Sequence, residues 1–249
     1  MRPTFPLLVT FLLLYAALFI GSVRPCEAGA KPDILKILDD IEASYGKLSS
    51  YTATFLKQER VDGELLPEET IRFKFKKPFK VYMGWLKGTP HGGREALYVA
   101  GRYDNKIVGH EGGILGIVTL HMDPKGGTAM KGNRHPITDS GIGRLIEIVT
   151  QNGRRAIKNG EGKFDIAGEE TVFGRQAYVI KAELPEEKEK GYYARSIKIW
   201  VDREAGLPIR ILIYGWEGEL LESYGYKDLK VNPGIPDDEF DENYKGYGF

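Results

Sequence analysis

The chain has 249 residues, of which 42% are hydrophobic and 28% are charged, a composition that is typical of globular proteins and excludes a disordered chain. It contains 35 basic and 35 acidic residues, so its formal net charge is zero. A chain without net charge has no global field that attracts it to nucleic acid or to an anionic surface, so any such contact has to be local.

The first thirty residues are typical of a secretory signal peptide. Arg2 precedes a hydrophobic run over residues 7–20, and small residues follow from Ala28 to Ala30. The run is shorter than the roughly 20 apolar residues that cross a bilayer. We therefore expect a signal peptide over residues 1–30, a single mature domain over residues 31–249 and a periplasmic location.

The only cysteine, Cys26, lies inside that first segment. It follows Val23, Arg24 and Pro25, which do not fit the small residues of a bacterial lipobox. Cleavage after Ala30 removes Cys26, and a mature chain without a thiol has no disulfide, no cysteine nucleophile and no thiolate metal site.

Two segments have the periodicity of amphipathic helices. Apolar residues recur every three or four positions from Asp33 to Leu48, and the same spacing returns over residues 142–149. We expect Asp139 or Ser140 to cap the second helix, and Gly160 to end it.

The other segments alternate apolar and polar residues, which predicts strands. The first four strands are expected over residues 51–60, 71–76, 79–85 and 94–101, with connections too short for a crossover helix. A glycine-rich stretch follows with a short strand at 117–122, and later hairpins are expected over residues 168–184, 192–216 and 218–232. The fold class is therefore α+β, with one curved antiparallel sheet and a few helices on it, and the acidic residues after 232 form an edge or a tail.

Three stretches resemble the periplasmic outer-membrane lipoprotein carrier superfamily of LolA-like and LolB-like proteins. Residues 34–60, "ILKILDDIEASYGKLSSYTATFLKQER", are similar to its first helix and strand, and "RFKFKKPFKVYMGW" is similar to its F-x-x-P-x-K-x-x-W strand pair. Residues 199–241 resemble its last strands, including a Y-x-D-L-K-x-N strand at 226–232. The resemblance implies an unclosed half β-barrel covered by helices and a hydrophobic ligand. Residues 93–143 depart from the true carriers, which indicates an uncharacterised bacterial branch.

A curved sheet with helices across its concave face leaves an apolar cavity between the two layers. We expect the ligand to contact inward-facing side chains of the sheet, polar residues at the cavity mouth and the covering helix: Phe55, Phe73, Phe75, Met83, Trp85, Tyr98, Arg134, His135, Ile142 and Leu145. Apolar residues of these types are ordinarily core, so the alternative is that they fill the interior.

The stretch "GNRHPITDSGIGRL", residues 132–145, contains an Arg-His pair, a proline and candidate helix caps within fourteen residues. Arg134 and His135 could form a polar clamp for a carboxylate or phosphate head group, since arginine binds such groups by two parallel hydrogen bonds. Alternatively, Pro136 fixes the entry to the helix and His135 bonds a loop carbonyl. Gly141 and Gly143 allow the helix to approach the sheet closely.

No motif predicts an enzyme or a cofactor. A Gly-x-Ser-x-Gly elbow, a P-loop and a dinucleotide fingerprint are all missing from the sequence. The histidines at 91, 110, 121 and 135 are not spaced as pairs that bind a metal, so we assign neither a metal nor any other cofactor.

A basic strand pair is the one local charge feature, formed by Arg72, Lys74, Lys76, Lys77 and Lys80. It could contact an anionic membrane or an acidic partner, or be a solvated face whose lysines discourage edge pairing.

These observations favour a non-enzymatic binding or carrier protein that holds an acyl chain, a lipid or a lipoprotein in the half-barrel. The expected partners are a hydrophobic ligand or a lipidated protein, with peripheral contact to a membrane and none to nucleic acid. The alternative is a cell-envelope protein interaction module with a filled core and no ligand.

Overall fold

A computed structural model describes residues 33–113 and 118–249, and the expected signal segment at residues 1–30 lies outside them. The strands, in chain order, are β1 (Ser50–Val61), β2 (Glu64–Leu65), β3 (Glu69–Lys76), β4 (Lys80–Trp85), β5 (Glu95–Val99), β6 (Ile107–His110), β7 (Leu120–Met122), β8 (Lys163–Val172), β9 (Arg175–Glu183), β10 (Ser196–Asp202), β11 (Pro208–Tyr214) and β12 (Leu220–Val231). The α-helices are α1 (Ile34–Gly46), α2 (Gly127–Met130) and α3 (Ile142–Lys158). Short 3-10 turns are η1 (Tyr103–Asn105), η3 (Ile137–Asp139), η4 (Lys188–Lys190) and η5 (Asp237–Phe240).

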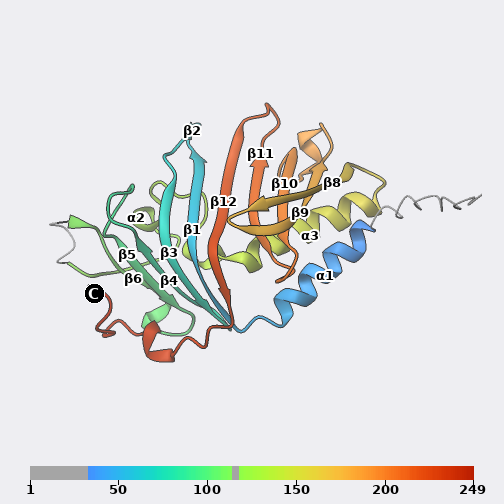
Figure 1. Cartoon of the computed structure of the whole chain (residues 1–249). Coiled ribbons are helices and arrows are strands. Elements are labelled where there is room, and N and C mark those ends of the chain that lie inside the picture. The colour runs from blue at the N-terminus through green and yellow to red at the C-terminus, as the bar shows by residue number, and fades with distance from the viewer. Residues whose placement is uncertain (1–32, 114–117) are drawn as a thin grey trace, which may run out of the picture. The chain divides into compact units, whose positions relative to one another are not determined.

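The strands form one antiparallel sheet in the order β7-β6-β5-β4-β3-β1-β12-β11-β10-β9-β8, with β2 paired only to β1 (Figure 1). Among the described residues, β7 and β8 are its two edges, so the sheet is not closed. This confirms the expected α+β half-barrel. The order also places β1 beside β12, so the first and the last strand of the chain pair with each other in the middle of the sheet.

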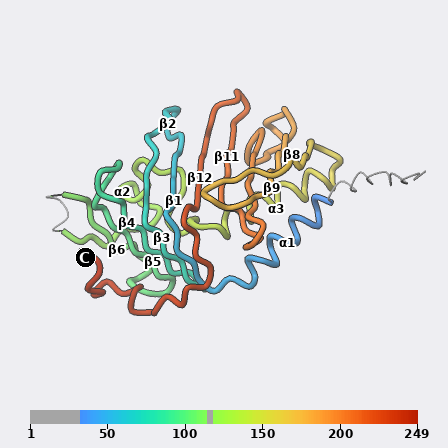
Figure 2. The backbone as a smooth tube through the Cα atoms, viewed as in Figure 1, coloured from blue at the N-terminus to red at the C-terminus, as the bar shows by residue number. Residues whose placement is uncertain are grey.

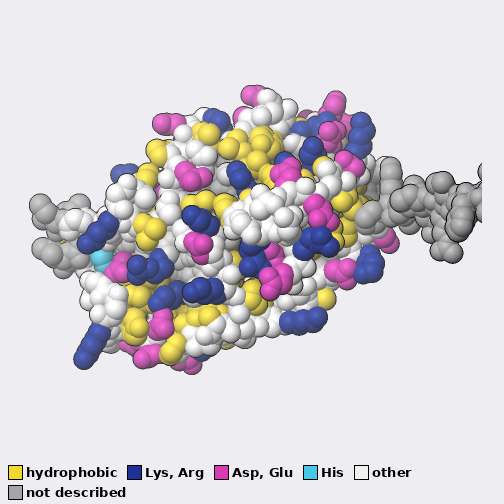
Figure 3. All heavy atoms as spheres, viewed as in Figure 1, with side chains coloured by type: hydrophobic (Ala, Val, Ile, Leu, Met, Phe, Trp, Pro, Cys, Tyr) yellow, Lys and Arg dark blue, Asp and Glu magenta, His cyan; other side chains and the backbone are white. Residues whose placement is uncertain are grey.

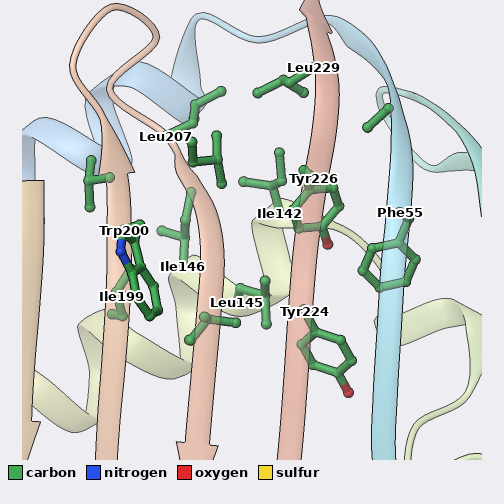
Figure 4. Packing of buried hydrophobic residues seen from close by; sticks show 14 of the residues in the cluster. Phe55, Ile142, Leu145, Ile146, Ile199, Trp200, Leu207, Tyr224, Tyr226 and Leu229 are labelled. Atoms are coloured by element: carbon green, nitrogen blue, oxygen red, sulfur yellow. The ribbon is translucent and has the colours of Figure 1, made fainter. Parts of the chain in front are cut away.

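Helix α3 lies behind β1, β12 and β11 in the view of Figure 1 and covers one face of the sheet. Its apolar stripe supplies Ile142, Leu145 and Ile146 to the main core, as Figure 4 shows. Helix α1 packs on α3, and Arg154 of α3 binds carboxylates of α1 on its exposed side. No helix in the described part of the chain combines the length and the apolar character that crossing a bilayer requires.

The start of α3 differs from the expected cap by Asp139 or Ser140. Residues 137–139 form the separate turn η3, and Gly141 takes the N-cap position with a φ of 101° and no side-chain cap. The Oη of Tyr51 on β1 instead accepts a hydrogen bond of 2.9 Å from the amide of Ile142. The expectation was wrong because a distant buried tyrosine, and not a neighbouring side chain, satisfies the first amide of the helix.

The acidic residues after β12 form a strap over the basic face of β3 and β4. Asp237 lies 2.7 Å from the Nζ of Lys76 and 2.8 Å from the Nζ of Lys80, and Glu239 binds Lys74. Hydrogen bonds from both lysines lower the pKa of Asp237 to about 2. Three of the five residues of the basic face predicted from the sequence therefore bind the chain's own C-terminal segment.

Aromatic contacts hold the last residues of the strap in place. Tyr247 stacks on Tyr82 of β4 at 3.8 Å between ring centroids, and the amide of Gly248 donates to Glu95. The C-terminus accordingly lies beside β6 in Figure 2. On the face drawn in Figure 3, basic side chains lie among acidic ones and do not form a single positive patch.

We expect Gly141→Ala to destabilise the protein by about 1–3 kcal/mol, because overpacking and a positive φ act together there. A Cβ at this position would lie 2.6 Å from the Oη of the fully buried Tyr51. Urea denaturation would measure the change in free energy of unfolding.

Gly46→Ala is the matched control, because a Cβ at Gly46 would meet nothing within 4 Å. Alanine at this last position of α1 is expected to leave stability unchanged or raise it slightly. Equal destabilisation by both variants would contradict the role given to Gly141.

Candidate ligand-binding cavity

A cavity of about 970 Å³ lies on the α3 side of the sheet, between β1, β3 to β6 and β12 and the segment that leads into α3. This volume is at the upper end of the range for small-molecule sites. Its apolar lining comprises Phe55, Leu66, Pro67, Met83, Trp85, Ala96, Ile107, Leu120, Met122, Ile137, Leu145, Ile148 and Tyr226. Side chains therefore leave this part of the interior open, whereas they pack closely elsewhere beneath α3.

Five of the ten residues expected at the site line the cavity: Phe55, Met83, Trp85, His135 and Leu145. The other five lie outside its lining: Phe73, Phe75, Tyr98, Arg134 and Ile142. Phe73 and Phe75 stack on the ring of Tyr51 beneath the start of α3, so they are packed core. Tyr98 packs edge-on against Phe79, and Ile142 is fully buried.

One wall of the cavity is charged. Lys57 and Glu59 on β1, Glu69 on β3 and Glu222 on β12 all line it. The strand register places Glu59 directly opposite Glu222, and Lys57 directly opposite Glu69. We call Lys57, Glu59, Glu69, His135 and Glu222 the polar wall.

Arg134 and His135 bind the polar wall from the loop before α3. The Nε of Arg134 donates to Glu222 at 3.0 Å, and the Nε2 of His135 lies 3.1 Å from the same Oε1. The backbone amide of Arg134 donates to Glu59 at 2.8 Å. This one dipeptide therefore bridges two carboxylates that face each other across a strand pair, an arrangement that is otherwise destabilising.

Glu222 is fully buried and remains ionised. Burial raises the pKa of its carboxyl group, but hydrogen bonds from His135 and Tyr193 and the positive charges of His135 and Arg134 outweigh burial and lower the pKa below 4.5. The Oη of Tyr193 donates to it at 2.6 Å. Burial and the neighbouring carboxylate in turn raise the pKa of Tyr193, so its hydroxyl stays a donor.

The rest of the polar wall is a second connected network. The Nζ of Lys57 donates to Asn133 at 2.7 Å and to Glu69 at 3.3 Å. The indole N–H of Trp85 donates to the same oxygen of Glu69 at 3.1 Å. Tyr224 donates its hydroxyl to Glu59 at 2.5 Å. Figure 4 shows Tyr224 on the inner side of β12, in line with Tyr226.

The four histidines are separated, and each lies near a different carboxylate. The pairs are His91 with Glu69, His110 with Glu95, His121 with Glu242 and His135 with Glu222. Within residues 33–113 and 118–249, no three histidine, cysteine or acidic side chains are arranged to hold a metal ion. The chemistry that this arrangement offers is therefore hydrogen bonding and charge next to the apolar side chains of the cavity.

Sequence reasoning missed the charged residues of the wall, although their positions carried a signal. Residues 57 and 59 lie two and four positions after Phe55 on β1, so they face the same side of the sheet as Phe55. In the same way, Glu69 faces the same side as the inward residues of β3, and Glu222 faces the same side as Tyr224. Alternation places every second residue of a strand on the same face. A charged residue at such a position predicts either a buried ion pair or a functional group in a cavity.

The fold and the cavity define a LolA-like half-barrel with an internal cavity. Residues 48–249 match the DUF1571 family, described as a protein of unknown function, and the chain belongs to that family. No curated protein matches the chain.

Solved structures with a similar fold include a mycobacterial lipoprotein and a LolA superfamily protein. The Mycobacterium tuberculosis lipoprotein LppX is 13% identical with a TM-score of 0.49, and the match covers 83% of this chain and 99% of that one. A LolA superfamily protein from Nitrosomonas europaea is 11% identical with a TM-score of 0.36, and the match covers 84% and 97% of the two chains.

MucB is also similar. In the Pseudomonas aeruginosa MucA/MucB complex the match has 15% identity and a TM-score of 0.46, and covers 83% of this chain and 60% of that one. This chain spans about three fifths of the MucB chains that it matches. At these identities and scores, no function is transferred from any of these structures.

We expect Glu222→Gln to lower the free energy of unfolding by about 1–3 kcal/mol at neutral pH, because the amide weakens three hydrogen bonds to a buried group. The native pKa of Glu222 lies below its ordinary value of 4.5. The stabilisation by the carboxylate is therefore complete above pH 4.5 and is lost as the pH falls through the native pKa. Urea denaturation over a pH series should show the difference from wild type shrinking in acid.

Glu186→Gln is the control, since the Glu186 side chain is 87% exposed. Its stability should follow that of wild type at every pH. A difference between Glu222→Gln and wild type that stayed constant into acid would show that Glu222 is not an ionised group with a lowered pKa.

Proposed function

We propose that this protein binds an apolar ligand, an acyl chain, a lipid or the lipid anchor of a protein, in the cavity under the half-barrel and carries it within the cell envelope. The observation that supports the proposal is the cavity of about 970 Å³ on the inner side of the sheet. Phe55, Met83, Trp85 and Leu145 supply apolar contacts for the ligand. Burial of an alkyl chain there contributes about 0.8 kcal/mol for each methylene group.

A periplasmic location and a lipidated protein as donor or acceptor belong to the same proposal. They rest on the signal peptide expected over residues 1–30. The alternative of an interaction module requires a filled interior, whereas the cavity supports a binding function. The proposed activity is transfer of a bound molecule without chemical change.

Protein purified gently from its native source is expected to carry an apolar molecule, detectable by mass spectrometry of solvent extracts. Added fatty acid at about 100 times its Kd should stabilise the stripped protein by about 2.7 kcal/mol. A stabilisation of that size raises the Tm by roughly 5–10 °C for a chain of this length. Repeated extraction of no apolar molecule, together with an unchanged Tm, would refute the proposal.

Ala96→Trp is expected to weaken binding of the fatty acid about tenfold, equivalent to the contacts of about two methylene groups. Ala96 lines the cavity on β5 opposite Met83, so the indole fills space that the ligand would occupy. Isothermal titration would measure the Kd, and circular dichroism would check the fold.

Leu35→Trp is the matched control, because Leu35 is 39% exposed on α1 and is not part of the cavity lining. Its Kd should equal that of wild type. If Ala96→Trp also binds with the wild-type Kd, the ligand site is not this cavity.

A further inference from the structure

The polar wall carries an excess of negative charge, and the charged residues in the rest of the cavity lining do not offset it, since they are three acidic and three basic ones: Glu95, Glu111, Asp139, Arg94, Lys131 and Arg144. Glu59, Glu69 and Glu222 are 3%, 6% and 0% exposed. Among the described residues, only two permanent cations, Lys57 and Arg134, lie within ion-pair distance of these three carboxylates. The histidines His91 and His135 also lie within ion-pair distance of Glu69 and Glu222. The group therefore keeps one negative charge at a pH at which neither histidine carries a proton.

Both permanent cations are already engaged by the protein. The Nζ of Lys57 donates hydrogen bonds to Glu69 and Asn133 and forms an ion pair with Glu59 at 3.4 Å. Arg134 donates its Nε to Glu222 and an Nη1 hydrogen to the carbonyl of Arg60. Arg134 also lies outside the cavity lining, so it does not offer a head group in the cavity the bidentate site that the sequence suggested.

Glu222 has further capacity as an acceptor. Its Oε1 receives Arg134, His135 and Tyr193, whereas its Oε2 has no hydrogen-bond partner among the described residues. A buried carboxylate oxygen without a donor is costly, and a positive or donating group nearby relieves that cost. Glu222 lines the cavity, so such a group can come from a ligand.

We infer that the cavity selects amphiphiles whose polar end is an ammonium group over those whose polar end is a carboxylate. This inference rests on the proposed function, because it assigns the head group of the same apolar ligand. An ammonium end at the polar wall neutralises the excess negative charge and can donate three hydrogen bonds. A carboxylate end is placed beside three buried carboxylates, and such like-charge contacts cost several kcal/mol.

Three probes with one alkyl chain test the inference: dodecylamine, dodecanol and dodecanoic acid. Isothermal titration of the delipidated full chain at neutral pH, below the micelle concentration of each probe, would give the three Kd values. We expect dodecylamine to bind at least about tenfold more tightly than dodecanoic acid, with dodecanol between them. Lysophosphatidylethanolamine against lysophosphatidylglycerol repeats the comparison with lipid head groups, one with an ammonium group and one without.

Removing one charge from the wall should reduce the preference. In Glu222→Gln, and separately in Glu69→Gln, the ratio of the dodecanoic acid Kd to the dodecylamine Kd should fall about tenfold, since one unit charge is lost at close range. Glu186→Gln, on the exposed surface, should keep the wild-type ratio. If Glu222→Gln does not fold, Glu69→Gln and the wild-type ratio still decide the question.

The outcomes separate the inference from the proposed function. Dodecanoic acid binding as tightly as dodecylamine, or a ratio unchanged in both wall variants, overturns head-group selection while an apolar carrier remains. Failure of all three probes to bind removes the proposed function itself. The inference is supported if wild type prefers dodecylamine over dodecanoic acid about tenfold. The two wall variants must reduce this preference, and Glu186→Gln must keep it.

Discussion

The pairing of β1 with β12 is the interaction on which the rest of the structure depends. The strands from β3 to β7 extend the sheet on the far side of β1, and those from β8 to β11 extend it beyond β12. The same register places Phe55 opposite Tyr226 and Glu59 opposite Glu222. One strand pair therefore supplies both an aromatic contact beneath α3 and the carboxylate pair at the charged end of the cavity.

The carboxylate pair in turn constrains the covering helix. Two like charges that face each other across a strand pair need donors between them, and Arg134 and His135 provide these donors. A few residues later, Tyr51 on β1 accepts the first amide of α3. Buried polar contacts on both sides of η3 thus hold the N-terminal end of α3 over the sheet, and the cavity remains beside it.

The net charge of zero is the sum over two different local arrangements of charged side chains, one at the surface and one in the cavity. Three lysines of β3 and β4, namely Lys74, Lys76 and Lys80, form ion pairs with Asp237 and Glu239 of the C-terminal strap at the surface. Inside the cavity the acidic groups outnumber the permanent cations that contact them. Solvent screens the ion pairs between the lysines and the strap, whereas the low dielectric of the interior strengthens the electrostatic interactions in the cavity. Charge therefore affects function mainly in the cavity.

The amino-acid sequence by itself determined the helices, the strands and the antiparallel meander, because helical and strand periodicity are local properties that tertiary contacts preserved here. The unclosed half-barrel was implied by the resemblance to the LolA-like proteins. Of the ten side chains that the sequence predicted for the site, five line the cavity: Phe55, Met83, Trp85, His135 and Leu145. Only the tertiary structure decided that Phe73 and Phe75 are core, since the start of α3 covers them. It also decided the partners of the charged wall: Arg134 and Glu222 are 88 positions apart, and the register of the whole sheet brings them together.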